Sequence, residues 1–384
     1  MPTDTTNVTV NEDRIRAALA TVNDPEIRRP ITELGMVDKV DVIGVDGGYV
    51  VAVRVLLTIA GCPLRETITR DVTAAVRAVQ GVSEVRLELG VMTDEQRGQL
   101  KTNLRGPTKD IQFARPESRT RVYAIASGKG GVGKSTVTVN LAAALAAKGL
   151  AVGLLDADVY GFSIPRMMGV TGQPTQVDDM MLPPVAHGVK VISVGMFVDG
   201  NTPVVWRGPM LHRALQQFLA DVYWGDLDVL LLDLPPGTGD IAISTAQLIP
   251  TTEILVVTTP QTAAAEVAER AGAIALQTRQ KVAGVVENMS PMTLADGSVL
   301  ELFGSGGGQI VADSLSRVTG APVPLIAQIP LDPALREAGD SGLPLVLRPE
   351  AADSPAARAL RRVADDLAAR TRPLVGMSLG LSPR

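Results

Sequence analysis

The sequence predicts an α/β fold, in which a mostly parallel sheet has helices on both faces and a small α+β domain precedes it. Three observations predict it. After Arg121, short apolar runs take turns with helical stretches, the runs show little internal alternation, and each ends in polar residues or glycine. Strands buried on both faces have such continuous runs, and a strand-then-helix order implies a parallel sheet.

The composition fits that fold and excludes several classes of protein. Hydrophobic residues make up 46% of the 384 residues and aromatic residues only 3%, so the core is mainly aliphatic, and the length suggests two or three domains. The net charge of -5 gives no general affinity for nucleic acid. No apolar run reaches the roughly 18–20 residues that span a bilayer, and the polar start lacks the apolar part of a signal peptide. We therefore expect a cytoplasmic protein that binds neither membranes nor nucleic acid.

The first expected domain is the small α+β unit at residues 10–92. Apolar periodicity predicts its elements in the order helix, strand, helix, strand. They are a helix from Asn11 or Glu12 to Ala20, a strand at Val50–Leu57, a helix at Leu64–Val79 and a strand at Val82–Leu89. Residues 93–120 are basic and polar with prolines at 107 and 116, and they are interpreted as a linker.

The second expected domain, residues 121–372, contains the parallel sheet, and residues 373–384 form a tail. Its clearest helix is Lys134–Lys148, closed by Gly149. The apolar runs expected to be strands are Val122–Ala126, Ala151–Leu155, Val229–Leu232, Ile254–Val257 and Val282–Val286. Ligands of open α/β sheets bind at the carboxyl ends of the strands, so the residues after these runs are the candidate site.

The loop after the first run fits the phosphate-binding pattern G-x-x-x-x-G-K-[ST]. Glycines let backbone N–H groups surround phosphate oxygens, the lysine reaches the outer phosphates, and the hydroxyl of Ser135 binds Mg²⁺. A strand before the loop and a helix after it complete the motif. The residues predicted to bind nucleotide here are Gly128, Lys129, Gly130, Gly131, Val132, Gly133, Lys134, Ser135 and Thr136.

Carboxylates follow two further runs. Asp233 ends a four-residue apolar run, as expected of a carboxylate that supports Mg²⁺. The loop after it begins its glycine pair at Gly237 and is expected to sense the γ-phosphate. Asp156 and Asp158 follow the neighbouring run, where one is expected to hold a magnesium-bound water and the other to orient the attacking water.

Several longer motifs resemble one family. Lys129 gives the loop the deviant Walker A form of the branch that includes MinD, Mrp and the nitrogenase iron protein. Five segments together resemble the Mrp/ApbC iron–sulfur cluster carrier ATPases, namely Asp156–Gly161, Ser163–Pro165, Trp206–Met210, Asp233–Asp240 and Glu287–Ser290. The first domain resembles the SufT/PaaD-like domain through Asp24–Glu26, Glu33–Val37, Thr58 and Gly61–Pro63.

The resemblance implies a homodimer that binds ATP and Mg²⁺, hydrolyses ATP slowly and delivers an iron–sulfur cluster to apo-proteins. It implies that Lys129 reaches the partner's nucleotide and that Asp158 positions the water, with Lys134 as the other catalytic residue. Asp156 and Ser135 are then the expected Mg²⁺ ligands. Asn288 would read the adenine edge, and Pro330 would be a second base contact.

The sequence departs from the family where the cluster ligands are expected. The family's C-x-x-C pair follows Glu287–Ser290, but residues 291–298 contain no cysteine, and Cys62 is the only cysteine of the chain. Cys62 lies between an expected strand and helix, so it is either a cluster ligand or a small buried apolar residue. Two other functions remain open, a nucleotide-switched MinD/ParA-type dimer that acts through a protein partner, and a phosphotransferase.

Overall fold

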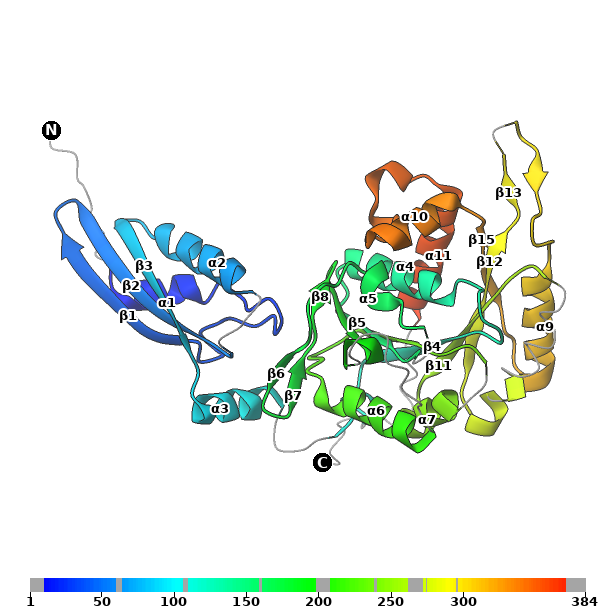
Figure 1. Cartoon of the computed structure of the whole chain (residues 1–384), viewed down its shortest axis with the longest axis horizontal. Helices are drawn as coiled ribbons and strands as arrows, with labels where there is room; N and C mark the ends of the chain where they lie inside the picture. Colours follow the sequence, from blue (N-terminus) through cyan, green and yellow to red (C-terminus); the bar gives the residue numbers. More distant parts are fainter. Residues whose placement is uncertain are drawn as a thin grey trace, which may run out of the picture. The chain divides into compact units, whose positions relative to one another are not determined.

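The computed structural model describes residues 10–59, 64–105, 110–158, 161–197, 208–237, 240–261, 272–273, 275–294 and 296–370 (Figure 1). The chain divides into two compact units. The N-terminal unit comprises Met1–Thr108 together with Pro174–Leu182, and the P-loop unit comprises Lys109–Gln173 together with Pro183–Arg384.

The N-terminal unit is built on a three-stranded sheet in the order β1-β2-β3. Strands β1 (Val37–Val45) and β2 (Gly48–Leu57) are antiparallel, whereas β2 and β3 (Val82–Val91) are parallel. Helices α1 (Glu12–Leu19) and α2 (Arg65–Arg77) contact each other and the sheet. The buried residues of α2 are Ile68, Val72 and Val76, which recur every fourth residue and so form one apolar stripe.

Helix α3 (Asp94–Arg105) lies inside the segment interpreted as a linker, which the polar composition did not anticipate. Its start is fixed by reciprocal capping bonds. The N–H of Gln96 donates to Thr93 Oγ1 (3.3 Å), and the N–H of Thr93 donates to Gln96 Oε1 (2.9 Å). This is the capping box pattern, with a threonine followed three residues later by glutamine. The pattern was present in the sequence but lacked an apolar run behind it.

The N-terminal unit also includes a hairpin from the middle of the chain. Strands β6 (Thr175–Val177) and β7 (Met180–Leu182) pair with each other in an antiparallel ladder. The sequence does not predict this hairpin, because its strands are only three residues long and its turn is the dipeptide Asp178-Asp179 rather than one containing glycine.

The P-loop unit contains an eight-stranded sheet, and this confirms the predicted α/β fold. The strand order is β15-β12-β11-β4-β10-β5-β9-β8, and every pair is parallel except β8 with β9. Each of the five predicted runs lies in a strand. The strands are β4 (Arg121–Ala126), β5 (Val152–Asp156), β8 (Val185–Ala186), β9 (Val189–Ser193), β10 (Val229–Asp233), β11 (Glu253–Thr258), β12 (Val282–Ser290) and β15 (Leu325–Pro330).

Helices cover both faces of this sheet. Helix α4 (Lys134–Ala147) and helix α11 (Pro355–Ala369) share a core with Leu255 and Val257, whereas α9 (Gly307–Thr319) shares a core with Ile254 and Val256. Neighbouring residues of a strand point to opposite faces, so α9 lies opposite α4 and α11. Figure 1 shows α6 (Gly208–Asp221) and α7 (Asp240–Leu248) on the face away from α4.

The remaining elements are short or lie at the edges of the P-loop unit. They are η1 (Gln112–Ala114), α5 (Ile164–Met167), η2 (Val194–Phe197), the strands β13 (Met292–Thr293) and β14 (Val299–Leu300), α10 (Pro333–Ser341), η3 (Leu345–Leu347) and η4 (Pro349–Ala351). Among the helices of the described residues, none has the length and apolar character needed to cross a membrane.

Candidate nucleotide-binding site

The loop between β4 and α4 has the backbone conformation of a phosphate cradle. Gly131 and Gly133 have φ angles of 77° and 76°, which glycine adopts far more readily than other residues. Gly133 is the N-cap of α4 and has no side chain with which to cap it. The N–H groups of the first helical turn therefore face the loop, at the positive end of the helix dipole, where anions bind.

Asp233 is the centre of a buried polar cluster beneath this loop. Its Oδ2 lies 2.7 Å from Lys134 Nζ and accepts a hydrogen bond from Ser135 Oγ (2.6 Å). Its Oδ1 accepts a second hydroxyl bond, from Thr138 Oγ1 (2.7 Å). Lysine and carboxylate are both buried. The three partners come from α4, so Asp233 fixes the start of this helix against the end of β10.

Asp156 lies beside Asp233 on the neighbouring strand. The two residues are paired in the register of β5 and β10, and Asp156 is fully buried. Burial, and secondarily the charge of Asp233, raises the pKa of Asp156 to about 8. Its Oδ2 accepts from Ser193 Oγ (3.0 Å), and its Oδ1 accepts from the N–H of Asp158 (3.1 Å). A cation in this place would favour the ionised form, so the pair suits a divalent metal.

Asn288 touches the loop directly. Its Nδ2 donates to the carbonyl of Val132 (2.9 Å), and a Cβ placed on Gly133 would lie 2.3 Å from that nitrogen. The close approach requires glycine at this position. The side chain predicted to read adenine therefore contacts the phosphate loop here, and its role at the base remains a prediction.

The other predicted nucleotide contacts lie at the same edge of the sheet. Pro330 ends β15 and pairs in register with Ser290 at the end of β12, one strand from Asn288. Gly237 follows β10, and its N–H donates to the carbonyl of Ser127 (2.8 Å) immediately before the loop. The carboxyl ends of β4, β10, β5, β12 and β15 thus bring the predicted residues of the described chain to one edge.

The two further catalytic candidates are Lys129, within the loop, and Asp158, after β5. The ammonium of Lys129 hydrogen-bonds the amide oxygen of Gln261, just after β11. Asp158 is buried two residues after β5. The catalytic role of Asp158 and the reach of Lys129 into a partner subunit stay predictions.

Some functional contacts were missed from sequence. Thr138, Ser193 and Gln261 have no motif of their own, and only the tertiary contacts described above reveal them. Thr138 does lie four residues after Lys134, which places both on the same face of α4, and that spacing was the available signal. Cys62, the other predicted metal ligand, lies outside the described residues.

The donor atoms fit a magnesium nucleotide. The described residues contain no cluster of three or more His, Cys, Asp or Glu side chains that could hold a metal ion alone. Mg²⁺ usually takes one or two carboxylates and completes its shell with water and substrate phosphates. The hydroxyl of Ser135 and the carboxylates of Asp156 and Asp233 supply that partial set, next to the cradle for the phosphates.

Comparison with known proteins agrees with this geometry. Residues 118–368 match the family described as NUBPL iron-transfer P-loop NTPase, and residues 12–87 match the family described as iron–sulfur cluster assembly protein. The iron–sulfur cluster carrier protein of Mycobacterium tuberculosis strain H37Rv is 67% identical over 371 residues, which is 96% of either chain.

Two more distant matches point the same way. The iron–sulfur cluster carrier protein of Bacillus subtilis strain 168 is 40% identical over 324 residues, which is 84% of this chain and 88% of the relative. A nucleotide-binding protein from Archaeoglobus fulgidus, solved with ADP, is 35% identical with a TM-score of 0.53. It covers 64% of this chain, and 96% of its own length is matched.

Proposed function

We propose that this chain, which belongs to the NUBPL iron-transfer family of P-loop NTPases, is a cytoplasmic ATP-dependent carrier that delivers iron–sulfur clusters to apo-proteins as a homodimer. The observation that carries the proposal is the cluster around Asp233, which joins the lysine and hydroxyl of a phosphate loop to a second carboxylate. The carrier role is supported by relatives that match nearly the whole chain.

ATP binding follows from the residues of the loop. The backbone N–H groups of residues 128–136 surround the β- and γ-phosphates, and Lys134 turns from Asp233 toward them. Bound Mg²⁺ neutralises charge that develops on the phosphates during hydrolysis. Ser135 and Asp156 would hold it, with Asp233 as the partner that orients Ser135. Asn288 and Pro330 then lie on the side of the adenine.

Hydrolysis needs a positioned water molecule. Asp158 is proposed to orient it in line with the γ-phosphate, and Gly237 starts the loop that senses whether that phosphate is present. Lys129 is proposed to reach the nucleotide of the partner subunit, for which it must leave Gln261. Because catalysis here is mainly positioning, we expect slow turnover by the free protein.

The cluster is the cargo, and the chain has few ligands for it. A [4Fe–4S] cluster takes four thiolates, and two copies of this chain supply two, both from Cys62. Asp24 and Glu26 belong to the same resemblance to the SufT/PaaD-like domain, and both already accept hydrogen bonds: Asp24 Oδ1 accepts two backbone N–H groups, and Glu26 Oε1 accepts from Thr175. We therefore propose that a small-molecule thiol completes the ligand set.

A transfer assay tests the proposal. The reconstituted chain is mixed with the apo form of an iron–sulfur enzyme, with and without ATP and Mg²⁺, and recovery of that enzyme's activity is followed. We expect recovery that depends on the chain, and an Asp158→Ala variant that still binds ATP but hydrolyses it at least about tenfold more slowly. Recovery no faster than with free iron and sulfide would contradict the carrier role.

A second function is favoured by one observation. The stretch where the family has its C-x-x-C pair contains no cysteine here, and the strands β13 and β14 that pair around it carry exposed apolar residues, Val299 and Leu300. A nucleotide-switched dimer that acts on a protein partner without cargo would need no cysteine there. The same assay separates the two functions, because this alternative predicts ATP hydrolysis without transfer.

A further inference from the structure

The β6–β7 hairpin is held by the N-terminal unit although its sequence interrupts the P-loop unit. The chain leaves the P-loop unit after Gln173 and returns at Pro183. One face of the hairpin is buried, with Val177, Met180 and Leu182 each at most 1% exposed. A two-stranded hairpin of three-residue strands is not stable in isolation, so its conformation depends on the N-terminal unit.

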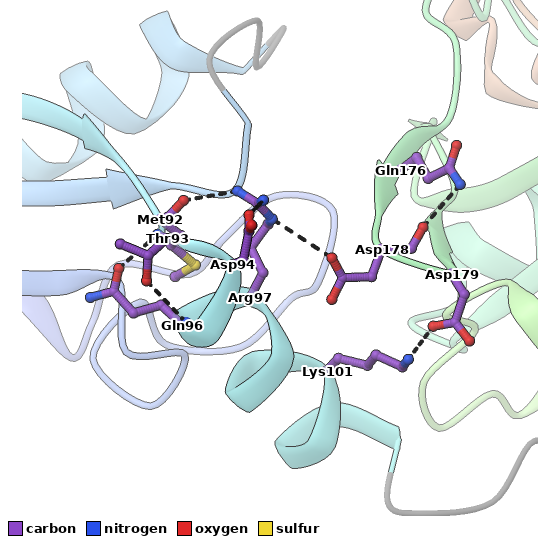
Figure 2. A network of polar contacts seen from close by, with 9 residues as sticks. All are labelled: Met92, Thr93, Asp94, Gln96, Arg97, Lys101, Gln176, Asp178 and Asp179. Atoms are coloured by element: carbon purple, nitrogen blue, oxygen red, sulfur yellow. Dashed lines mark hydrogen bonds and ion pairs between the residues drawn. The ribbon is translucent and has the colours of Figure 1, made fainter.

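The tip of the hairpin is acidic and meets a basic face of α3. Asp178 Oδ1 lies 3.8 Å from Arg97 Nε, and Asp179 forms an ion pair with Lys101. Arg97 and Lys101 are four residues apart, so both project from the same face of the helix. Figure 2 shows the two cations extending from α3 toward the two carboxylates.

A buried hydrogen bond anchors the base of the hairpin. Thr175 Oγ1 donates to Glu26 Oε1 over 3.0 Å, and both side chains are buried. The segment that contains Glu26 is itself fixed, because Asp24 Oδ1 accepts the N–H groups of Glu26 and Ile27. A buried hydrogen bond is more costly to break than a partly exposed ion pair, so this bond holds the hairpin and the tip pairs orient it.

Both ends of the hairpin connect to ordered parts of the nucleotide-binding unit. On the near side, β5 ends at Asp156, and Ile164 and Met168 of the α5 region are buried in the main core. On the far side, the carbonyl of Pro184 accepts from the N–H of Val191 at the sheet edge. Only short stretches separate these fixed points from Thr175 and Leu182.

We infer that this hairpin couples nucleotide binding at the phosphate loop to the conformation of the N-terminal unit. A displacement of the chain that follows Asp156 and Asp158 is passed along residues 161–173 to a segment that the N-terminal unit holds rigidly. The coupled elements in that unit are α3, through the charge pairs, and the segment around Glu26. The inference rests on the proposed ATP binding.

Hydrogen exchange of the full chain tests the coupling. With a non-hydrolysable ATP analogue and Mg²⁺, we expect slower amide exchange in α3 and in residues 24–31. Lys101→Glu should reduce that response about fivefold or more, as expected for a change near 1 kcal/mol. The charge swap Lys101→Glu with Asp179→Lys should restore it. Arg86→Glu, which breaks an exposed pair with Glu84 on β3, is the matched control and should leave the response intact.

Affinity for the ATP analogue, measured on the same samples, distinguishes failure of the coupling from failure of the proposed ATP binding. Normal affinity with no response of the N-terminal unit would overturn the coupling and leave the proposed function standing. Absent affinity in the unaltered chain would overturn the proposed function itself. An unchanged response in Lys101→Glu, or a charge swap that fails to restore the response while keeping the unaltered melting temperature, would overturn the role of the hairpin.

Discussion

Gly133 is the residue whose identity the phosphate loop tolerates least. It has a positive φ of 76°, and an added Cβ would meet Asn288 Nδ2 at 2.3 Å. Gly133→Ala should therefore weaken ATP binding at least about tenfold, because the added Cβ displaces the Asn288 amide from the carbonyl of Val132 or shifts the loop, and backbone strain adds roughly 1–2 kcal/mol. Titration calorimetry with ATP and Mg²⁺ measures the effect.

Gly149 offers the matched control. It also has a positive φ, 85°, but nothing lies within 4 Å of an added Cβ. Gly149→Ala should show the strain alone, as a loss of stability with ATP affinity kept. If the two alanine variants bind ATP equally well, the contact between Asn288 and the loop is not required.

Glu26 predicts a pH dependence in the N-terminal unit. Burial raises its pKa from 4.5 to about 7, and the hydrogen bond from Thr175 opposes that shift only partly. The folded state therefore keeps a proton that the unfolded state loses above pH 4.5, so stability falls as pH rises from about 4.5 to 7 and is then level. The full loss is on the order of 3 kcal/mol.

Glu26→Gln removes this titration and keeps the acceptor for Thr175. Hydrogen exchange of the buried amides of β2, measured between pH 5 and 8 and corrected for intrinsic exchange, gives the stability of the N-terminal unit. In Glu26→Gln this stability should no longer fall as pH rises. Glu33→Gln changes an exposed glutamate of the same unit and should keep that fall. If the stability of Glu26→Gln still falls as pH rises, another group is responsible for the titration.

At the level of single residues, motifs predicted some contacts and missed others. Gly128–Thr136, Asp156 and Asp233 were predicted as site residues from motif spacing and from the ends of apolar runs, and the contacts among Lys134, Ser135 and Asp233 and the pairing of Asp156 with Asp233 agree with that grouping. Ser193 donates a hydrogen bond to Asp156, and Thr138 donates one to Asp233. These contacts could not be predicted without knowing that β9 and α4 lie beside the two carboxylates. Partners chosen by tertiary packing leave no local pattern in the chain.

Among elements, Glu287 is a buried carboxylate that connects several parts of the sheet. It is fully buried, and it accepts from Ser290 Oγ (2.7 Å), Gln328 Nε2 (2.9 Å) and the N–H of Gly308 (2.6 Å). Its carboxylate thus joins β12, β15 and the start of α9. It follows the apolar run Val282–Val286, and its contacts with three elements indicate a structural role.

Removal of that carboxylate should loosen three elements at once. Glu287→Ala removes the acceptor of the buried N–H of Gly308 and one acceptor each of Ser290 Oγ and Gln328 Nε2, and we expect a loss of about 2–4 kcal/mol in the free energy of unfolding. Chemical denaturation measures it, with Glu301→Ala as an exposed control expected to stay within about 0.5 kcal/mol. A loss no larger than that of the control would show that water replaces the carboxylate.

Three of the elements missed from sequence are the strand β1, the polar helix α3 and the short β6–β7 hairpin. The apolar strands of the sheet were predicted from continuous hydrophobic runs, whereas capping bonds fix the start of α3, and ion pairs and buried side chains hold the β6–β7 hairpin. Those contacts depend on residues distant in sequence, such as Glu26 with Thr175, so periodicity could not reveal them.

For the whole molecule, the sequence predicted the parallel sheet and the edge at which its candidate site lies. It did not predict where an iron–sulfur cluster would bind. The order of strands places the ends of β4, β5 and β10 together, and the ligand edge follows from topology. Topology does not predict a cluster site in the same way, because the only cysteine of the chain, Cys62, lies outside the position of the family's usual pair.

Anaerobic reconstitution with iron and sulfide, in the presence of a small thiol, tests the central claim most directly. Iron and acid-labile sulfide are counted per dimer in the unaltered chain and in Cys62→Ser, with ATP affinity measured on both. The account predicts near-stoichiometric cluster in the unaltered chain, its loss in Cys62→Ser, and equal ATP affinity. No retained iron beside intact ATP binding would contradict the carrier function and leave a nucleotide-driven switch.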